Sequence, residues 1–168
     1  MTRSTARALR TDAQWVAQIY REHYKFVWRT LARLGVPDAA LEDALQDVFI
    51  VLHRRRNDFE GRASVKTWLY GIAIRIARRA RERQGRRQTL PLLDNEVSLR
   101  ADPERTSMQR QALTRLDAAL SQLSDEQREV FVLFEIEGLQ AKTVASIVGV
   151  GRNTVYSRLR LARENFGR

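Results

Sequence analysis

The chain has 168 residues, with 30 Lys and Arg against 20 Asp and Glu, a formal net charge of +10 and no cysteine. This length suits one ordinary domain or two small ones, and the absence of thiols excludes disulfides and thiolate metal sites. The positive excess is local, because residues 1–90 hold 19 basic against 9 acidic side chains, whereas residues 91–168 hold 11 of each. We therefore expect an anionic partner, bound mainly by the N-terminal half.

No run of residues approaches the roughly 18 consecutive apolar side chains of a transmembrane helix, and the N-terminus lacks the apolar core of a signal peptide. We expect a soluble, cytoplasmic protein with no membrane insertion. Attraction of the positive charge to a membrane surface stays open as a minor alternative, because it would need a bulky apolar face beside the arginines.

Apolar side chains at helical spacing predict two amphipathic helices in the first part of the chain. The first is marked by Val16, Ile19, Tyr20, Tyr24, Val27, Leu31 and Leu34, and the second by Leu41, Leu45, Val48 and Leu52. Gly35 follows the first helix and Pro37 opens the second, which is the usual placement of these residue types at helix ends.

A third helix is predicted after the polar residues 58–67, and one side of it is strongly basic. Its apolar stripe comprises Leu69, Ile72, Ala73, Ile76 and Ala80, and its other side carries Arg75, Arg78, Arg79 and Arg86, with Arg81, Arg83 and Arg87 beside them. Seven arginines offset by one acid, Glu82, would repel one another unless a polyanion neutralised them. We interpret the stripe as a track for a phosphodiester backbone, with a solvated helical face as the alternative.

The loop before this helix and the helix start combine basic and aromatic groups. They are Gly61, Arg62, Ser64, Lys66, Trp68 and Tyr70. This combination suits an unpaired nucleic-acid strand, whose bases can stack or enter a pocket. A role as core anchor is the favoured interpretation of Trp68 itself.

Helical periodicity dissolves over residues 85–98, which predicts a linker, and then resumes. Asp102 and Pro103 are placed to start a helix, and Ser124 with Gln127 form a capping-box pair for the next one. Its core side comprises Val130, Phe131, Leu133 and Phe134. Because no alternating strand pattern occurs, the predicted fold class is all-α, with two small helical domains, an N-terminal bundle and a C-terminal helix-turn-helix bundle, joined by a flexible linker.

Residues 139–163 have the layout of a helix-turn-helix, with a Gly-Val-Gly turn between two short helices. Val155, Leu159, Ala162 and Phe166 form the face that packs on Val144, Ile147 and Val148. The opposite face presents Asn153, Tyr156, Ser157 and Arg160, with Arg152 near the helix start, and these groups suit base edges and phosphates in a major groove. For Arg158 an ion pair or phosphate clamp over the core is as favoured as base contact.

The second predicted helix carries an acidic patch, although the N-terminal half of the chain is basic overall. Glu42, Asp43, Gln46 and Asp47 share one exposed side. A metal site is the least favoured interpretation, because His23 and His53 are isolated and adjacent helical carboxylates bind divalent ions poorly. Docking of a protein is the sharper hypothesis, and no metal or other cofactor is expected.

With these features in order, the chain resembles the bacterial extracytoplasmic-function (ECF) sigma factors, the short two-domain class of RNA polymerase specificity subunits. Residues 43–61 are similar to the family's core-binding helix, residues 63–87 to its minus-ten recognition and melting segment, and residues 123–163 to its minus-thirty-five domain. The resemblance implies a sigma factor that is not an enzyme. It would direct core polymerase to promoters and assist opening of the duplex.

The resemblance implies a region 2 domain at residues 10–87, a linker at 88–106 and a region 4 domain at 107–168. The implied core polymerase contacts are Asp43, Gln46, Asp47 and Phe49. The implied minus-ten contacts are Gly61, Arg62, Ala63, Ser64, Lys66, Trp68, Arg75, Arg78 and Arg79. The implied minus-thirty-five contacts are Arg152, Asn153, Thr154, Tyr156, Ser157, Arg158 and Arg160. The implied partners are the clamp helices and flap of core polymerase, promoter DNA as duplex and as unpaired non-template strand, and an anti-sigma factor.

Some positions depart from the family pattern. Thr143 stands where relatives usually have Glu, Gly151 where the turn usually has Pro, and Arg75 where Asn is common. Asn153 and Tyr156 also replace a common Gly and Lys. These differences bear on base preference and on the role of Arg75 in strand capture.

Two rival functions follow from the residues. A stand-alone helix-turn-helix regulator would bind duplex DNA without polymerase, although no extra dimerisation helix is visible. A nuclease would use Glu42, Asp43 and Asp47 with a divalent metal, for which no carboxylate from another segment is evident.

Overall fold

The computed structural model describes residues 3–87 and 107–166, with side chains placed for residues 14–86 and 111–165. Within these residues the chain is helical and contains no strand, which confirms the all-α prediction. The first part comprises α1 (Arg3–Arg33), α2 (Asp38–Arg54), the 3₁₀ turn η1 (Arg56–Asp58) and α3 (Val65–Arg87). The second comprises α4 (Ser107–Ser121), α5 (Asp125–Phe131), the π-helical turn η2 (Val132–Ile136), α6 (Ala141–Val148) and α7 (Arg152–Phe166).

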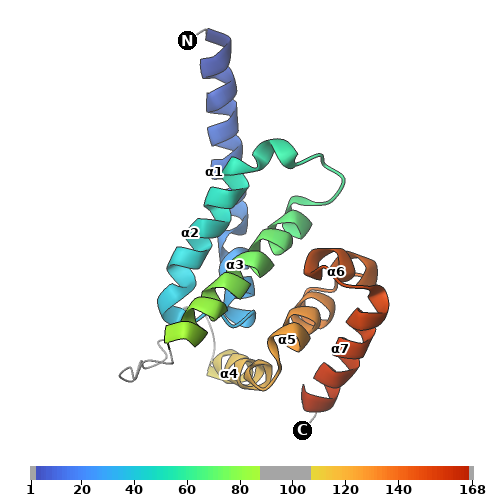
Figure 1. Cartoon of the computed structure of the whole chain (residues 1–168). Helices are drawn as coiled ribbons and strands as arrows, with labels where there is room; N and C mark the ends of the chain where they lie inside the picture. Colours follow the sequence, from blue (N-terminus) through green and yellow to red (C-terminus); the bar gives the residue numbers. More distant parts are fainter. Residues whose placement is uncertain (1–2, 88–106, 167–168) are drawn as a thin grey trace.

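Helices α1, α2 and α3 pack together as a first unit (Figure 1). Its core side chains Val27, Leu31, Val48, Leu52 and Leu69 are fully buried. The chain turns sharply between α1 and α2 because Gly35 adopts a φ of +80°, which an L side chain rarely tolerates. The Val36 N–H donates to the Leu31 carbonyl at 3.1 Å, completing the helix end that Gly35 and Pro37 predicted.

Helices α4 to α7 form a second unit, in which α5 contacts α7 and α6 contacts α7. Val155, Leu159 and Ala162 of α7 are buried, as are Val144 and Val148 of α6, so the predicted packing face is confirmed. The turn between α6 and α7 contains Gly149 at a φ of +83°.

The capping box at the start of α5 is also confirmed. The Gln127 N–H donates to Ser124 Oγ at 3.3 Å, and the Ser124 N–H donates to Gln127 Oε1 at 3.2 Å. The expected helix start at Asp102 and Pro103, and the side chain of Phe166, lie outside the described residues.

Two local features differ from the sequence expectation. Helix α1 begins at Arg3, well before Val16, the first residue of the predicted apolar stripe. Helix α5 continues into a wider π-helical turn, in which the Glu137 N–H donates to the Val132 carbonyl at 3.0 Å, five residues back. This turn places Glu137 on the side of the first unit.

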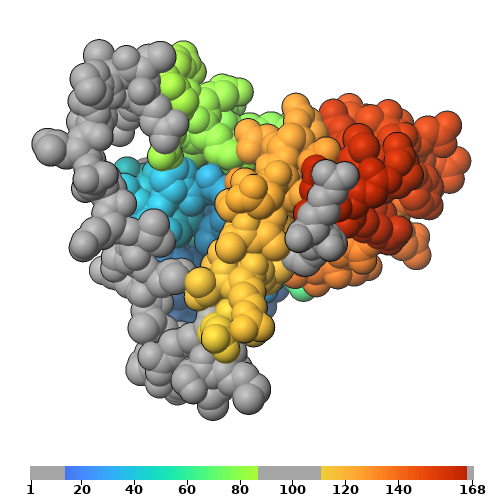
Figure 2. All heavy atoms as spheres, turned by 90° about the horizontal axis from the view of Figure 1, so that it is seen from below, coloured from blue at the N-terminus to red at the C-terminus, as the bar shows by residue number. Residues whose placement is uncertain are grey.

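The two units contact each other. Helix α6 lies against α3, and in the view from below α4 and α5 lie beside the first unit with α7 on the outer side (Figure 2). Periodicity predicted each bundle but not this contact. In the part of the chain that is described, no helix has the length and apolar character needed to cross a membrane.

Candidate nucleic-acid and protein interfaces

The acidic side of α2 is open to solvent over most of its length. Asp43 and Gln46 are exposed and Asp47 is half-buried. We call these three residues the docking face. Phe49, which the resemblance places in the same surface, is buried instead, and its ring packs edge-on against Tyr20 with centroids 4.7 Å apart. The structure therefore gives Phe49 a supporting position behind the docking face.

Exposed apolar side chains extend this acidic surface. Tyr20 and Tyr24 of α1 stack with centroids 5.7 Å apart, and both are partly open to solvent, as is Ile50 of α2. An anionic face with an apolar margin suits a protein partner better than a metal ion. Among the described residues, no group of three or more His, Asp or Glu side chains could hold a metal ion.

A pocket of about 340 Å³ lies between the loop after η1, the start of α3 and α6. Of the residues that the resemblance assigns to minus-ten DNA, the pocket is lined by Gly61, Arg62, Ala63, Trp68 and Arg75. Ser146 and Ile147 of α6 also line it, so the second unit forms part of its wall.

Trp68 and Ser64 hold the loop that borders this pocket. The half-buried Trp68 ring lies 5.2 Å from the Phe59 ring, which in turn lies 6.1 Å from Trp15. This aromatic row agrees with the favoured role of Trp68 as an anchor. Ser64 caps α3, since its Oγ accepts the Thr67 N–H at 3.1 Å.

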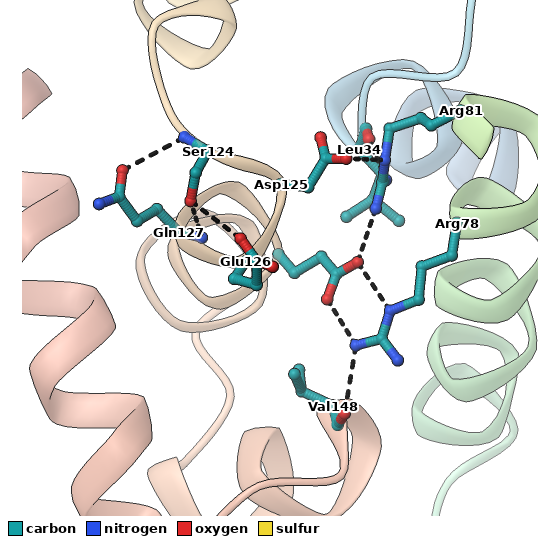
Figure 3. Close-up of polar contacts among 9 residues, drawn as sticks. Leu34, Arg78, Arg81, Ser124, Asp125, Glu126, Gln127 and Val148 are labelled. Atoms are coloured by element: carbon teal, nitrogen blue, oxygen red, sulfur yellow. Dashed lines mark hydrogen bonds and ion pairs between the residues drawn. The ribbon is translucent and has the colours of Figure 1, made fainter. Parts of the chain in front are cut away.

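The basic side of α3 is only partly exposed. Arg75 and Arg79 face solvent, whereas Arg78 forms a bidentate pair with Glu129 of α5. Arg78 Nε lies 2.9 Å from Oε1 of that carboxylate and Nη2 lies 2.6 Å from Oε2. Arg78 Nη2 also donates to the Val148 carbonyl at 3.1 Å (Figure 3). The hydrogen bonds to Glu129 raise the pKa of the Arg78 guanidinium.

Arg81 reaches the same carboxylate from the next turn of α3 (Figure 3). Its Nη2 lies 2.8 Å from Glu129 Oε1, and its Nε lies 3.0 Å from Asp125 Oδ2. Its Nη1 donates to the Leu34 carbonyl at 2.6 Å. Glu129 is only 2% exposed, and a buried carboxylate needs a compensating charge. Arg78 and Arg81 of the other unit supply it.

Glu137 makes a second set of contacts between the units. Arg33 Nη1 lies 3.0 Å from Oε1, the Tyr70 hydroxyl donates to Oε2, and Lys66 Nζ lies 3.7 Å from Oε2. Burial and then the hydrogen bond to Glu137 raise the pKa of Tyr70. Lys66 also lies over the Phe26 ring, 4.8 Å from its centroid.

The α7 surface, by contrast, is open. We call Arg152, Asn153, Thr154, Tyr156, Ser157 and Arg160 the reading face, and all six side chains are exposed. Within it Tyr156 is 55% exposed. Among the described residues, Arg160 pairs with its helix neighbour Glu164, at 2.5 Å. Arg158 is half-buried and lines a second pocket, of about 370 Å³, together with Arg78 and Arg81, which places it toward the first unit.

Sequence reasoning did not predict the contacts that join the units. It did not single out Arg33, Glu129 or Glu137, and it considered Tyr70 and Arg81 only for a nucleic-acid strand. One signal was available, because residues 130–134 are apolar on every side of their helix. A helix that is apolar on every side is buried, and the acid next to it, Glu129, then needs a partner because an unpaired buried charge is costly.

Comparison with known proteins gives matches over both units. Residues 19–87 match the family described as Sigma-70 region 2, and residues 113–166 match Sigma-70, region 4. The ECF RNA polymerase sigma factor SigM of Mycobacterium tuberculosis is 30% identical over 151 residues, which cover 90% of this chain and 74% of that protein. The ECF RNA polymerase sigma-E factor of Escherichia coli K12 is 28% identical, over 84% of this chain and 79% of that protein.

Two solved structures share the fold. The sigma factor RpoE of Bartonella quintana, solved with the anti-sigma factor NepR, has a TM-score of 0.72 at 22% identity and covers 89% of this chain and 92% of that one. CnrH, solved with the cytosolic domain of CnrY, has a TM-score of 0.67 at 22% identity and covers 96% of this chain and 91% of that one.

Proposed function

The chain belongs to the ECF sigma factors of the sigma-70 family, and on that premise we propose how its surfaces divide the steps of transcription initiation. As a member of this family it is a sigma factor, which binds core RNA polymerase and directs initiation at promoters. The observation that carries the proposal is that region 2 and region 4 matches coincide with the two packed units, each with its own polar surface.

We assign residues 10–87 to region 2, residues 88–106 to the linker and residues 107–168 to region 4. The docking face would bind the clamp helices of core polymerase, with the apolar margin of Tyr20, Tyr24 and Ile50 closing the contact against water. Region 4 would contact the flap. The site of action is cytoplasmic.

The minus-ten element would bind what we call the strand face, which consists of residues 61–64, Lys66, Trp68, Arg75, Arg78 and Arg79. The pocket beside residues 61–63 has a volume of about 340 Å³, which suits one extruded base. The arginines would hold the backbone of the unpaired non-template strand. Strand separation then needs no covalent chemistry, because binding of the extruded base offsets the few kcal/mol of unpairing and unstacking.

The minus-thirty-five element would bind the reading face on α7 as duplex DNA. Asn153 and Arg160 carry the amide and guanidinium groups that pair with adenine and guanine edges, and Arg152 lies at the helix start, where phosphates are favoured. An anti-sigma protein is a further proposed partner, supported by the fold shared with the sigma factor RpoE, which was solved with the anti-sigma factor NepR.

Run-off transcription tests this function. Purified protein with core polymerase on a promoter library should yield defined start sites, and core polymerase alone should not. Asp47→Arg should abolish holoenzyme formation, because it reverses the charge of the docking face, while leaving duplex binding by α7 intact. Folded protein that yields no start site on any promoter would overturn the function.

A further inference from the structure

We propose that Gly71 and Arg75 of α3 form a subsite that selects one unpaired base, and that the selected base has two adjacent hydrogen-bond acceptors on one edge. Guanine, through O6 and N7, and cytosine, through N3 and O2, meet this requirement, whereas adenine and thymine do not. The inference rests on the proposed function and deepens it, because the proposed minus-ten contact gives Arg75 only a share in holding the strand.

Four residues of the base pocket come from one face of α3. Trp68, Gly71, Ile72 and Arg75 follow the spacing i, i+3, i+4 and i+7, which places them on the same side of a helix. Ile72 is buried, and Gly71 beside it has no side chain. Along the helix, this face therefore offers an aromatic ring, then a gap, then a guanidinium group.

The fold itself does not require glycine at position 71. The residue lies inside α3 and has no positive φ, and glycine is less favourable than alanine in a helix interior. A Cβ added to Gly71 would meet no neighbouring atom of the described residues within 4 Å, although α6 borders the pocket. A flat ligand that approaches the helix backbone closely does require glycine, because a methyl group would hold it away.

Arg75 is the pocket arginine that the protein leaves unpaired. Arg55 Nε lies 2.9 Å from Asp58 Oδ2, and Arg62 Nε lies 2.6 Å from Glu60 Oε2. These two pairs use both carboxylates that line the pocket. Within residues 14–86 and 111–165, no hydrogen bond or ion pair involves the side chain of Arg75. Its donors are therefore available to a ligand.

The chemistry of the guanidinium group sets the chemistry of the base. Arginine has N–H donors and no acceptor, and two of its donors form a planar fork. A base that lies over Gly71 presents its edge to this fork, and the edge must carry two adjacent acceptors to use both donors. Arg79 is one helical turn further along α3 and does not line the pocket, so it keeps the role of a backbone contact.

The charged groups that line the pocket all belong to the first unit. Ser146 and Ile147 of α6 border the pocket as well, but neither carries a charge. The base selection that we assign to Arg75 therefore does not depend on where the second unit lies in a polymerase complex.

Binding of single-stranded oligonucleotides to the holoenzyme of this chain and core polymerase tests the proposal. Each probe is a fluorescent oligothymidine whose central position carries guanine, cytosine, adenine or thymine, and core polymerase alone gives the background. We expect the guanine or the cytosine probe to bind about tenfold more tightly than the adenine and thymine probes, as for a bidentate base contact. If guanine is preferred, 7-deazaguanine, which lacks N7, should remove the preference.

Arg75→Gln tests the donor. Glutamine pairs with N6 and N7 of adenine, so this variant should lose the wild-type preference and bind the adenine probe most tightly of the four. A contact from Arg75 to a phosphate would instead weaken the binding of all four probes by the same factor.

Gly71→Ala tests the gap. It should weaken binding of the preferred probe about tenfold, because the added methyl group holds the base away from the fork. The melting temperature of the free variant should not fall, since alanine favours the helix. Gly85→Ala is the matched control, because Gly85 also lies in α3 with open space around an added Cβ but does not line the pocket. This control should bind every probe as the wild type does.

Equal affinity of the wild-type holoenzyme for the four probes would overturn the inference. So would a uniform loss in Arg75→Gln, or unchanged probe binding by Gly71→Ala. Run-off transcription by the wild-type holoenzyme is a separate readout. Start sites without base selection would contradict this inference alone, whereas the absence of any start site would contradict the proposed function.

Discussion

The strand face and the reading face carry similar residue types, yet the structure treats them differently. On α3, Arg78 is bound to a buried carboxylate of the other unit. On α7, Arg160 pairs with an exposed neighbour four residues away, a contact that contributes little. Basic composition therefore indicates a nucleic-acid surface, but it does not show whether other parts of the protein already contact its arginines. Availability is decided by contacts between units.

The largest expected effect comes from removing the reading face altogether. Val155→Asp places an unpaired carboxylate at a position with no solvent exposure, which costs more than about 4 kcal/mol and should unfold the second unit. Duplex binding should disappear. Single-strand binding should increase, because Glu129 no longer holds Arg78. Circular dichroism and strand titration measure both effects, and a parallel loss of single-strand binding would contradict the comparison.

A smaller effect separates two neighbouring arginines of the strand face. Arg79→Ala should weaken single-strand binding about tenfold, equivalent to ~1.4 kcal/mol, because Arg79 is exposed. Arg78→Ala should weaken it less, since it loses a phosphate contact but also frees the surface from Glu129. Fluorescence anisotropy with the same oligonucleotide measures both. Equal losses would show that Arg78 is not occupied in the free chain.

On the reading face, the exposed amide of Asn153 offers a clean test. Asn153→Ala should reduce discrimination between promoter and unrelated duplex by about 1–3 kcal/mol, the range for a bidentate base contact. Single-strand affinity should not change. Competition gel shifts with holoenzyme measure the ratio, and Gln18→Ala on the exposed side of α1 serves as a control.

The smallest expected effect concerns the start of α5, which positions Asp125 and Glu129. Ser124→Ala removes the capping box and should cost about 1 kcal/mol of unfolding free energy. Hydrogen bonds from its own backbone N–H and from the Ser124 hydroxyl lower the pKa of Glu126. A lowered folded-state pKa stabilises the fold above the unfolded pKa, and this stabilisation is lost as pH falls through the folded value.

In the Ser124→Ala variant, the Glu126 pKa should rise toward its ordinary value, and the dependence of stability on acidic pH should weaken. Titration of the carboxyl by NMR measures the shift. An unchanged Glu126 pKa would show that the hydroxyl contributes nothing to it.

Much of each unit could be predicted from local pattern. Gly35 and Pro37 fix the turn between α1 and α2, and the spacing of Val155, Leu159 and Ala162 fixes which side of α7 is buried. These features depend on residues within one or two helical turns, where the 3.6-residue period carries information.

The contact between the units could not be predicted in the same way. Arg78 and Glu129 are 51 residues apart, and nothing in the period of α3 distinguishes Arg78 from the solvent-facing Arg79. The π-helical turn that orients Glu137 has no local sequence signal either. For the docking face, the pattern gave Asp43 and Gln46 as exposed, whereas the buried position of Phe49 depends on Tyr20 from another helix.

The most direct test of the account is the distance between the units in solution. The chain has no cysteine, so Ala39→Cys with Lys142→Cys allows clean spin labelling of α2 and α6 at exposed positions. In free protein we predict one narrow distance population, which gains a longer one on addition of single-stranded DNA or in the Glu129→Gln, Glu137→Gln background. A broad distribution in free wild-type protein, unchanged by DNA and by the two substitutions, would contradict the account.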